Sequence, residues 1–246
     1  MSSTGADRIP RPAIATETLS NRASALSDRL RVAVVAAILP VVLTSVLIGA
    51  YVGADGGSEV PRSVVDTAYG LSALAVLAGV YLSLDDREWR TAARFAVPDR
   101  SELLWTLVCL PLAVGAFVLG ATTGELLGFE LAGFSYSLAN RATLAAVVFG
   151  GIVVAPLVEE ILFRGLLLGS LLGRDLSPAV AALLSILLFA GVHIVALGIA
   201  GVLAIAGWAV FPTLLRLKFD NLTGAWLLHA LNNVYSYVVV VALGLA

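Results

Sequence analysis

The sequence is poor in charged, sulfur-containing and imidazole side chains. Charged residues make up 13% of the 246 positions, about half of the ~25% that is typical of soluble domains. A single cysteine, Cys109, excludes an internal disulfide and a zinc site built from several cysteines. The net charge of −2 gives no electrostatic basis for binding nucleic acid.

The sequence is instead rich in long apolar stretches. Hydrophobic residues make up 59% of the chain, and the mean hydropathy is +0.97. A membrane-spanning helix needs about 20 mostly apolar residues, and the stretches that reach or approach this length are 32–52, 64–84, 102–123, 142–172, 178–195, 198–215 and 223–245. We therefore predict an all-α polytopic transmembrane helix bundle with about seven spans. The mixed segment 124–140, read as an interfacial helix or a re-entrant loop, gives an alternative with an eighth element.

The N-terminal 31 residues are polar and precede the first apolar stretch. That stretch is about 21 residues long, whereas the apolar region of a cleavable signal peptide has only about 7–15 residues. We therefore expect a retained span preceded by a cytoplasmic tail, 1–31. The three spans in 32–123 carry no motif with a chemical meaning.

Arginine is distributed unevenly over the predicted loops. With the N-terminus inside the cell, the inner side holds Arg8, Arg11, Arg22, Arg29, Arg31, Arg87, Arg90, Arg94, Arg100, Arg174, Arg216 and Lys218. The outer side holds only Arg62 and Arg141. Because cytoplasmic loops carry the excess of Arg and Lys, we predict a multi-pass protein of the cell membrane with a cytoplasmic N-terminus.

The fourth stretch, 142–172, is too long for one straight crossing. Its 31 residues would reach about 46 Å as an α-helix, against a hydrocarbon core of about 30 Å. It contains Gly150, Gly151 and Pro156. We expect a kink or break near Pro156, or a helix that protrudes into the cytoplasm.

A few ionisable and amide side chains interrupt the spans. They are Glu159, Glu160, Arg164, His193, His229, Asn232 and Asn233. An ionisable group inside the membrane costs at least a few kcal/mol and is a functional candidate by default. Glu160 and Arg164 are four residues apart, so they share a helix face and are expected to pair. Glu159 lies about 100° away around the helix, which leaves it free to act.

Estimated depths in the membrane relate the two histidines and Asn233 to Glu159. At 1.5 Å per residue, Glu159 lies about 21 Å from one membrane surface, His193 about 22 Å, His229 about 10 Å and Asn233 about 16 Å. We therefore expect these groups to meet in one layer near the middle of the membrane. Phe189, one helical turn before His193, is placed to pack beneath the imidazole.

Chemically this set of residues suits hydrolysis without a serine or cysteine nucleophile. A buried carboxylate serves as a general base for water, one histidine orients that water, and the other histidine and an amide stabilise an oxyanion. An ion-coupled transporter is an alternative, because intramembrane Glu and His also mark ion pathways. Transporters usually show two related halves, and no internal repeat is visible. Two histidines and a glutamate also suit zinc, but the His-Glu-x-x-His signature is absent, so we expect no cofactor.

Three motifs resemble those of one known family. Residues 159–164 (EEILFR) fit Glu-Glu-x-x-x-Arg, residues 189–193 (FAGVH) fit Phe-x-x-x-His, and residues 229–233 (HALNN) fit His-x-x-x-Asn. In this order, each within an apolar span, they resemble the CAAX-protease and bacteriocin-processing (CPBP, Abi) family, which includes the type II CAAX prenyl endopeptidases. The resemblance covers about residues 140–240.

The resemblance implies an intramembrane glutamic endopeptidase whose cavity opens to the cytoplasm and whose catalytic core is 124–246. It makes Glu159 the base, assisted by His193, with His229 and Asn233 as oxyanion stabilisers and Glu160, Arg164 and Phe189 as supporting residues. The implied partners are membrane lipid and a peptide or lipidated protein, cleaved near its C-terminus. A non-proteolytic scaffold or immunity-type protein is the alternative within the family.

Overall fold

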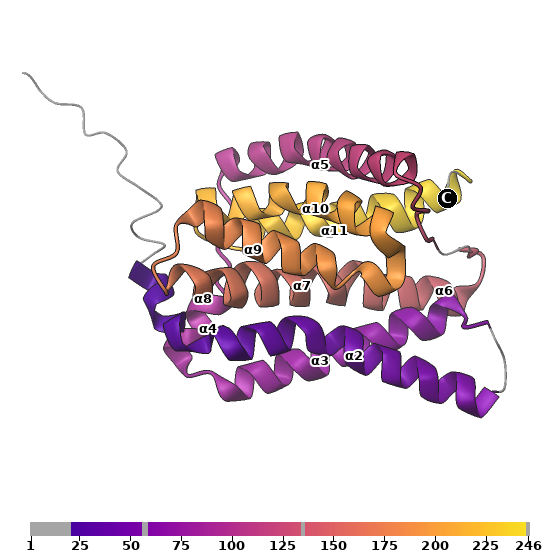
Figure 1. Cartoon of the computed structure of the whole chain (residues 1–246), viewed down its shortest axis with the longest axis horizontal. Coiled ribbons are helices and arrows are strands. Elements are labelled where there is room, and N and C mark those ends of the chain that lie inside the picture. Colours follow the sequence, from indigo (N-terminus) through magenta and orange to yellow (C-terminus); the bar gives the residue numbers. More distant parts are fainter. Residues whose placement is uncertain (1–20, 56–58, 134–135, 245–246) are drawn as a thin grey trace, which may run out of the picture.

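The structure, a computed structural model, describes residues 21–55, 59–133 and 136–244. These residues form helices and no strand, so the predicted all-α bundle is confirmed. The helices long and apolar enough to cross a membrane are α2 (Leu30–Asp55), α3 (Arg62–Ser83), α5 (Arg100–Leu126), a composite helix Arg141–Leu172, and α10 (Ile194–Phe219). Figure 1 shows them running side by side along the long axis of the molecule.

The shorter elements connect or complete these spans. They are η1 (Ser24–Arg29), α4 (Asp86–Ala92), α9 (Pro178–Gly191), α11 (Thr223–Val234) and η4 (Tyr235–Val240). The helix α9 has only 14 residues, and α11 continues directly into the π-helical η4. All seven predicted apolar stretches therefore appear as helices, with shifted ends.

The composite helix changes its hydrogen-bond pattern along its length. It consists of α6 (Arg141–Ala146), the π-helical η2 (Val147–Val154), α7 (Ala155–Glu159), the π-helical η3 (Glu160–Leu167) and α8 (Leu168–Leu172). The break predicted near Pro156 is absent from this described segment. Pro156 lies in the first turn of α7, immediately after a π segment, so its missing N–H falls where the pattern changes. Such π segments are frequent at functional sites.

The link between α9 and α10 differs from the predicted spans 178–195 and 198–215. Helix α9 ends at Gly191, Val192 and His193 form a turn, and α10 begins at Ile194. Gly198 then interrupts α10 with φ 68° and ψ −169°, a conformation that suits glycine because it has no Cβ. His193 therefore lies in a turn and not, as predicted, inside a span.

The segment after α5 contains no eighth helix among its described residues. Helix α5 ends at Leu126, and residues 127–133 and 136–140 form turns and irregular chain. The hydroxyl of Tyr136 donates a hydrogen bond to the carbonyl oxygen of Tyr237 at 2.8 Å. This loop therefore contacts the C-terminal helix.

The Arg-rich helix ends meet at one end of the bundle. Arg22 pairs with Asp220 at 2.5 Å and Arg29 with Glu88 at 2.6 Å. The side chain of Arg94 also donates to the carbonyl oxygen of Asp220 at 2.8 Å. These contacts join the start of α2, the α4 region and the end of α10, which lie together in Figure 1.

The predicted tail is described only from residue 21. Residues 1–20, with Arg8 and Arg11, lie outside the described residues. From Asn21 the chain is helical and runs through η1 into α2. Ala23 and Leu26 are buried and lie against Gly173 and Gly169 of the α8 region. The last part of the tail is therefore packed onto the bundle.

Candidate active site

The composite helix carries both predicted carboxylates at the junction of α7 and η3. Glu159 ends α7 and Glu160 begins η3, and they are 7% and 0% exposed. Arg164 lies one turn further on and is 1% exposed. Its Nη1 lies 3.1 Å from Oε1 of Glu160, so the expected pairing is present. Glu159 points elsewhere and takes no part in that ion pair.

The guanidinium of Arg164 is held from several sides. Its Cζ lies 4.1 Å from the ring centroid of Phe189, a cation–π geometry. It also donates to the hydroxyl of Thr213 and the carbonyl oxygen of Ala209, each at 3.4 Å. Helices α9 and α10 thus fix the cation that neutralises Glu160.

His229, on α11, lies between the two carboxylates. Its Nδ1 is 2.8 Å from Oε1 of Glu160, and its Nε2 is 3.7 Å from Oε2 of Glu159. The indole of Trp208 packs against the imidazole, with ring centroids 4.7 Å apart. The contact between His229 and Glu160 was not foreseen from the sequence, because no spacing rule relates residues on distant helices.

Asn233 lies one turn after His229 and is buried. Its amide nitrogen donates to the carbonyl oxygen of Gly151 at 2.8 Å, and Nδ2 of the neighbouring Asn232 lies 3.5 Å from its amide oxygen. Within the described chain, no hydrogen bond joins Asn233 to Glu159 or His229. It therefore lies beside the carboxylate–imidazole cluster, anchored to η2.

His193 reaches the cluster through Phe189. Its Nδ1 lies 2.7 Å from the carbonyl oxygen of Phe189, and the two rings are 4.8 Å apart at a tilt of 57°. Phe189 also lies edge-on to His229 at 6.1 Å. Among the described residues no hydrogen bond connects His193 with Glu159. The half-buried imidazole is held by the carbonyl oxygen of Phe189 on α9 and packs on the aromatic ring as expected.

Tyr69, on α3, is a contact of the site that sequence reasoning missed. Its hydroxyl donates a hydrogen bond to Oε1 of Glu159 at 2.5 Å. A tyrosine within an apolar span is unremarkable in sequence, and no motif marks it. The only available signal is that α3 follows α2 closely enough to pack against the same core.

Glycines allow the helices around the site to approach closely. A Cβ on Gly150 would overlap the carbonyl oxygen of Asp66 on α3, and one on Gly151 would lie 2.8 Å from the ring of Tyr237. A Cβ on Gly165 would likewise overlap the carbonyl oxygen of Ala92. The pair Gly150–Gly151 thus accommodates α3 on one side and η4 on the other.

The His, Cys, Asp and Glu side chains of the described residues are not grouped as a metal site requires. In the described ranges 21–55, 59–133 and 136–244, no group of three or more His, Cys, Asp or Glu side chains is placed to hold a metal ion. The cluster contains the Glu159 carboxylate, with one oxygen near the imidazole of His229, and the Glu160 carboxylate, which is paired with Arg164. Amide and imidazole groups that can donate hydrogen bonds lie beside them. These are the groups of an acid–base hydrolase.

The candidate site is thus a buried carboxylate–imidazole cluster inside a bundle of helices long enough to cross a membrane. Residues 141–235 match the family of type II CAAX prenyl endopeptidases, Rce1-like. This match agrees with the resemblance of the three motifs to the CAAX-protease (CPBP) family and supports a protease of that general type. No curated protein and no solved structure matches the chain. The family match includes the composite helix, α9, α10 and all of α11, and excludes α2, α3 and α5.

Proposed function

We propose that this chain cleaves peptide bonds with a water molecule activated by Glu159. The observation that carries the proposal is the environment of that carboxylate. It is 7% exposed, one oxygen accepts a hydrogen bond from Tyr69, and the other faces His229 at 3.7 Å. A carboxylate held in this way has a lone pair directed at a space shared with an imidazole, as a general base requires.

The reaction then follows from two proton transfers. Glu159 takes a proton from water as the water oxygen attacks the scissile carbonyl carbon, and the carbonyl electrons move to the oxygen. The tetrahedral intermediate collapses, the C–N bond breaks, and Glu159 gives its proton to the departing amine. His193 orients the water. His229 and the amide of Asn233 donate hydrogen bonds to the oxyanion, a contribution that is often large in acyl transfer.

Glu160 gives His229 its role in this scheme. When Nδ1–H of His229 donates to Glu160, which lies 2.8 Å away, the opposite nitrogen, Nε2, points toward Glu159. An imidazolium donates through both nitrogens, and Glu160 supplies the counter-charge for it. Arg164 shares the same carboxylate oxygen. In this assignment Glu160 is therefore a supporting residue and Glu159 the base.

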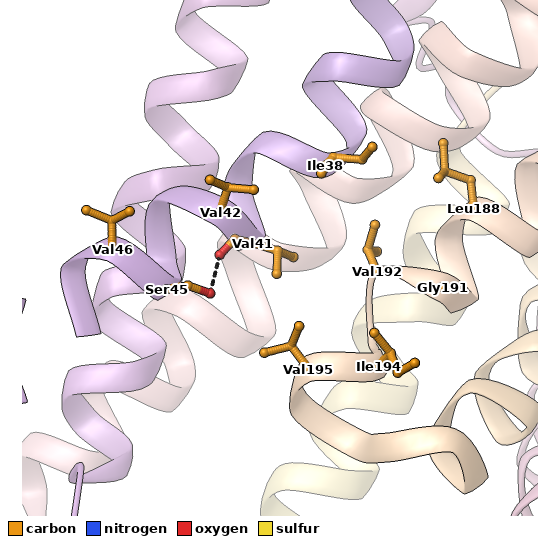
Figure 2. A pocket seen from close by; sticks show the side chains of 10 residues that line it. All are labelled: Ile38, Val41, Val42, Ser45, Val46, Leu188, Gly191, Val192, Ile194 and Val195. Carbon is orange, nitrogen blue, oxygen red and sulfur yellow. Dashed lines mark hydrogen bonds between the residues drawn. The ribbon is translucent and has the colours of Figure 1, made fainter. Parts of the chain in front are cut away.

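The substrate class is inferred from an apolar groove beside the site. The groove has a volume of about 620 Å³ and lies between α2 and the α9–α10 turn. Figure 2 shows its walls, with Ile38 and Val41 on α2 across from Leu188 and Val192. Both sequence neighbours of His193 line it. An isoprenoid chain on the substrate fits this surface, with the peptide segment directed toward the carboxylates.

The orientation of the chain in the cell membrane follows from its charges. Arg22, Arg29 and Arg94 are held at one end of the bundle, and that end is assigned to the cytoplasm by the positive-inside rule. The substrate would then be presented from the cytoplasmic side.

Purified protein in detergent tests the proposal directly. It is incubated with matched tetrapeptide-tailed substrates, one prenylated and one unprenylated, and the products are identified by mass. Cleavage near the C-terminus supports the endopeptidase. Failure to cleave either substrate under conditions where the protein is folded would favour the scaffold alternative.

A further inference from the structure

Helix α3 brings one hydroxyl group into the carboxylate cluster from outside the family match. Tyr69 lies on α3 (Arg62–Ser83), whereas the match covers 141–235. The hydroxyl is 2.5 Å from Oε1 of Glu159, a distance typical of a strong O–H···O⁻ hydrogen bond. No other side chain of α3 hydrogen-bonds to the cluster among the described residues.

The backbone around Tyr69 fixes how far its hydroxyl reaches. The next residue, Gly70, packs so closely that a Cβ there would lie 2.6 Å from the ring of Phe149. One turn earlier, the carbonyl oxygen of Asp66 occupies the space that a Cβ on Gly150 would need. Because α3 and η2 touch through these small residues, α3 lies close to the composite helix. The rigid tyrosine ring then spans the remaining distance to Glu159.

The phenol hydroxyl of Tyr69 donates a single hydrogen bond, and its acceptor is Oε1 of Glu159. The other carboxylate oxygen, Oε2, lies 3.7 Å from Nε2 of His229. The carboxylate is thus held at one oxygen and presents the other to the imidazole. A partial rotation of the carboxylate plane about the last side-chain bond of Glu159 breaks the hydrogen bond to Tyr69, whereas a half-turn only exchanges two identical oxygens.

We propose that Tyr69 is a positioning residue that fixes the rotamer of Glu159, so that Oε2 faces the water and His229. This inference rests on the proposed role of Glu159 as base. It gives the N-terminal spans a part in the reaction: α3 acts through Glu159 without touching the substrate. The two oxygen positions of the base therefore have different partners, Tyr69 at one and His229 at the other.

Tyr69→Phe tests this role, because it removes only the hydroxyl and keeps the ring that packs in the bundle. Tyr81→Phe is the matched control, since it removes the same atom from the same helix at a residue that is 55% exposed. Loss of a hydrogen bond to a charged group is expected to lower kcat by about 10- to 100-fold. KM is expected to stay unchanged, kcat per folded molecule is expected to fall by more than any lower thermal midpoint in detergent explains, and Tyr81→Phe is expected to match wild type throughout.

A spectroscopic measurement keeps the test independent of turnover. The protein is labelled with ¹³C at the side-chain carboxyl groups of glutamate, and its infrared spectrum is compared with that of Glu159→Gln. The carboxylate band that is absent from the variant is assigned to Glu159. We expect that band to shift in Tyr69→Phe and to stay in place in Tyr81→Phe. A band shift with wild-type kcat would overturn the positioning role, as would a fall in kcat that merely follows a lower thermal midpoint.

The same set of variants separates this inference from the proposed function. If Glu159→Gln cleaves normally, Glu159 is not the base and the proposed function fails. If Glu159→Gln is inactive while Tyr69→Phe has wild-type kcat and KM, the base assignment stands and the role of Tyr69 is wrong.

Discussion

The imidazole of His229 is closer to Glu160 than to Glu159, at 2.8 Å from the former and 3.7 Å from the latter. It approaches the two carboxylates through different ring nitrogens. Oε1 of Glu160 is also the oxygen that pairs with Arg164. One carboxylate oxygen therefore contacts both a guanidinium and an imidazole, while Glu159 has neither group at hydrogen-bonding distance. The two adjacent glutamates therefore have different surroundings: Glu160 contacts Arg164 and His229, whereas Glu159 does not contact Arg164.

Replacing Glu159 with glutamine is expected to abolish cleavage without unfolding the protein. Glutamine keeps the shape and accepts the Tyr69 hydrogen bond, but it cannot take a proton from water. General-base catalysis contributes roughly 10²–10⁴-fold, so the rate should fall by at least that range. Single-turnover cleavage and thermal stability are measured in the same detergent. A near-normal rate would remove Glu159 from the role of base and would strengthen the scaffold and transporter readings.

Replacing Glu160 with glutamine is expected to reduce stability first. The change leaves Arg164 without its counter-charge in a site where both side chains are 0% exposed. Breaking a buried ion pair by removing one partner costs about 3–5 kcal/mol. The loss of the His229 contact adds a fall in kcat for the fraction that folds. Thermal midpoint and the rate per folded molecule separate these effects. A fully stable but inactive variant would mean that the carboxylate roles are reversed, or that the pair shares a proton.

Local spacing predicted part of the site, and helix crossings determined the rest. The pairing of Glu160 with Arg164 and the stacking of Phe189 on His193 follow from i, i+4 geometry, and both are present. The contact of Tyr69 with Glu159 joins residues 90 positions apart. It depends on how closely α3 approaches the composite helix, which no pattern along the chain encodes.

For the fold, too, patterns along the chain predicted the helices but not the irregular backbone between them. Hydropathy located all the apolar helices, because burial in a membrane requires long apolar runs. It missed the turn at His193, since Val192 and Ile194 are as apolar as their helical neighbours and only Gly198 marks an irregular backbone. It also predicted a break near Pro156, where the helix instead continues with a change of hydrogen-bond pattern. The close packing of Gly150 against α3 could not be predicted, because a glycine required for packing and one that bends a helix look identical in a single sequence.

Cleavage is expected to survive strong chelators, because a glutamate-activated water needs no Lewis acid. Protein is treated with EDTA and with 1,10-phenanthroline, desalted and assayed beside an untreated sample. Retention of the full rate supports the proposed mechanism. Loss of activity that added zinc restores would instead support a metalloprotease, with Glu159, His193 and His229 as the first ligands to test.

The groove between α2 and the α9–α10 turn offers a test of substrate class. Gly191 lines this groove and has open space where a side chain would begin. Gly191→Phe therefore fills the groove without displacing the backbone. Gly79→Phe is the matched control, because Gly79 also faces open space and lines a separate apolar groove of about 480 Å³ between α2 and α3.

If the isoprenoid chain occupies the first groove, Gly191→Phe should raise KM for the prenylated substrate and leave the unprenylated one unaffected. Each buried CH₂ contributes about 0.8 kcal/mol, so excluding even two or three carbons predicts an increase of about 10-fold or more. The unprenylated substrate also serves as a control for His193, which is two residues from Gly191. If the substitution displaced His193, the cleavage rates of the prenylated and the unprenylated substrate would both fall. Equal behaviour of Gly191→Phe and Gly79→Phe toward the two substrates would show that the chain binds elsewhere, and prenylation would then lose its structural support as the recognised feature.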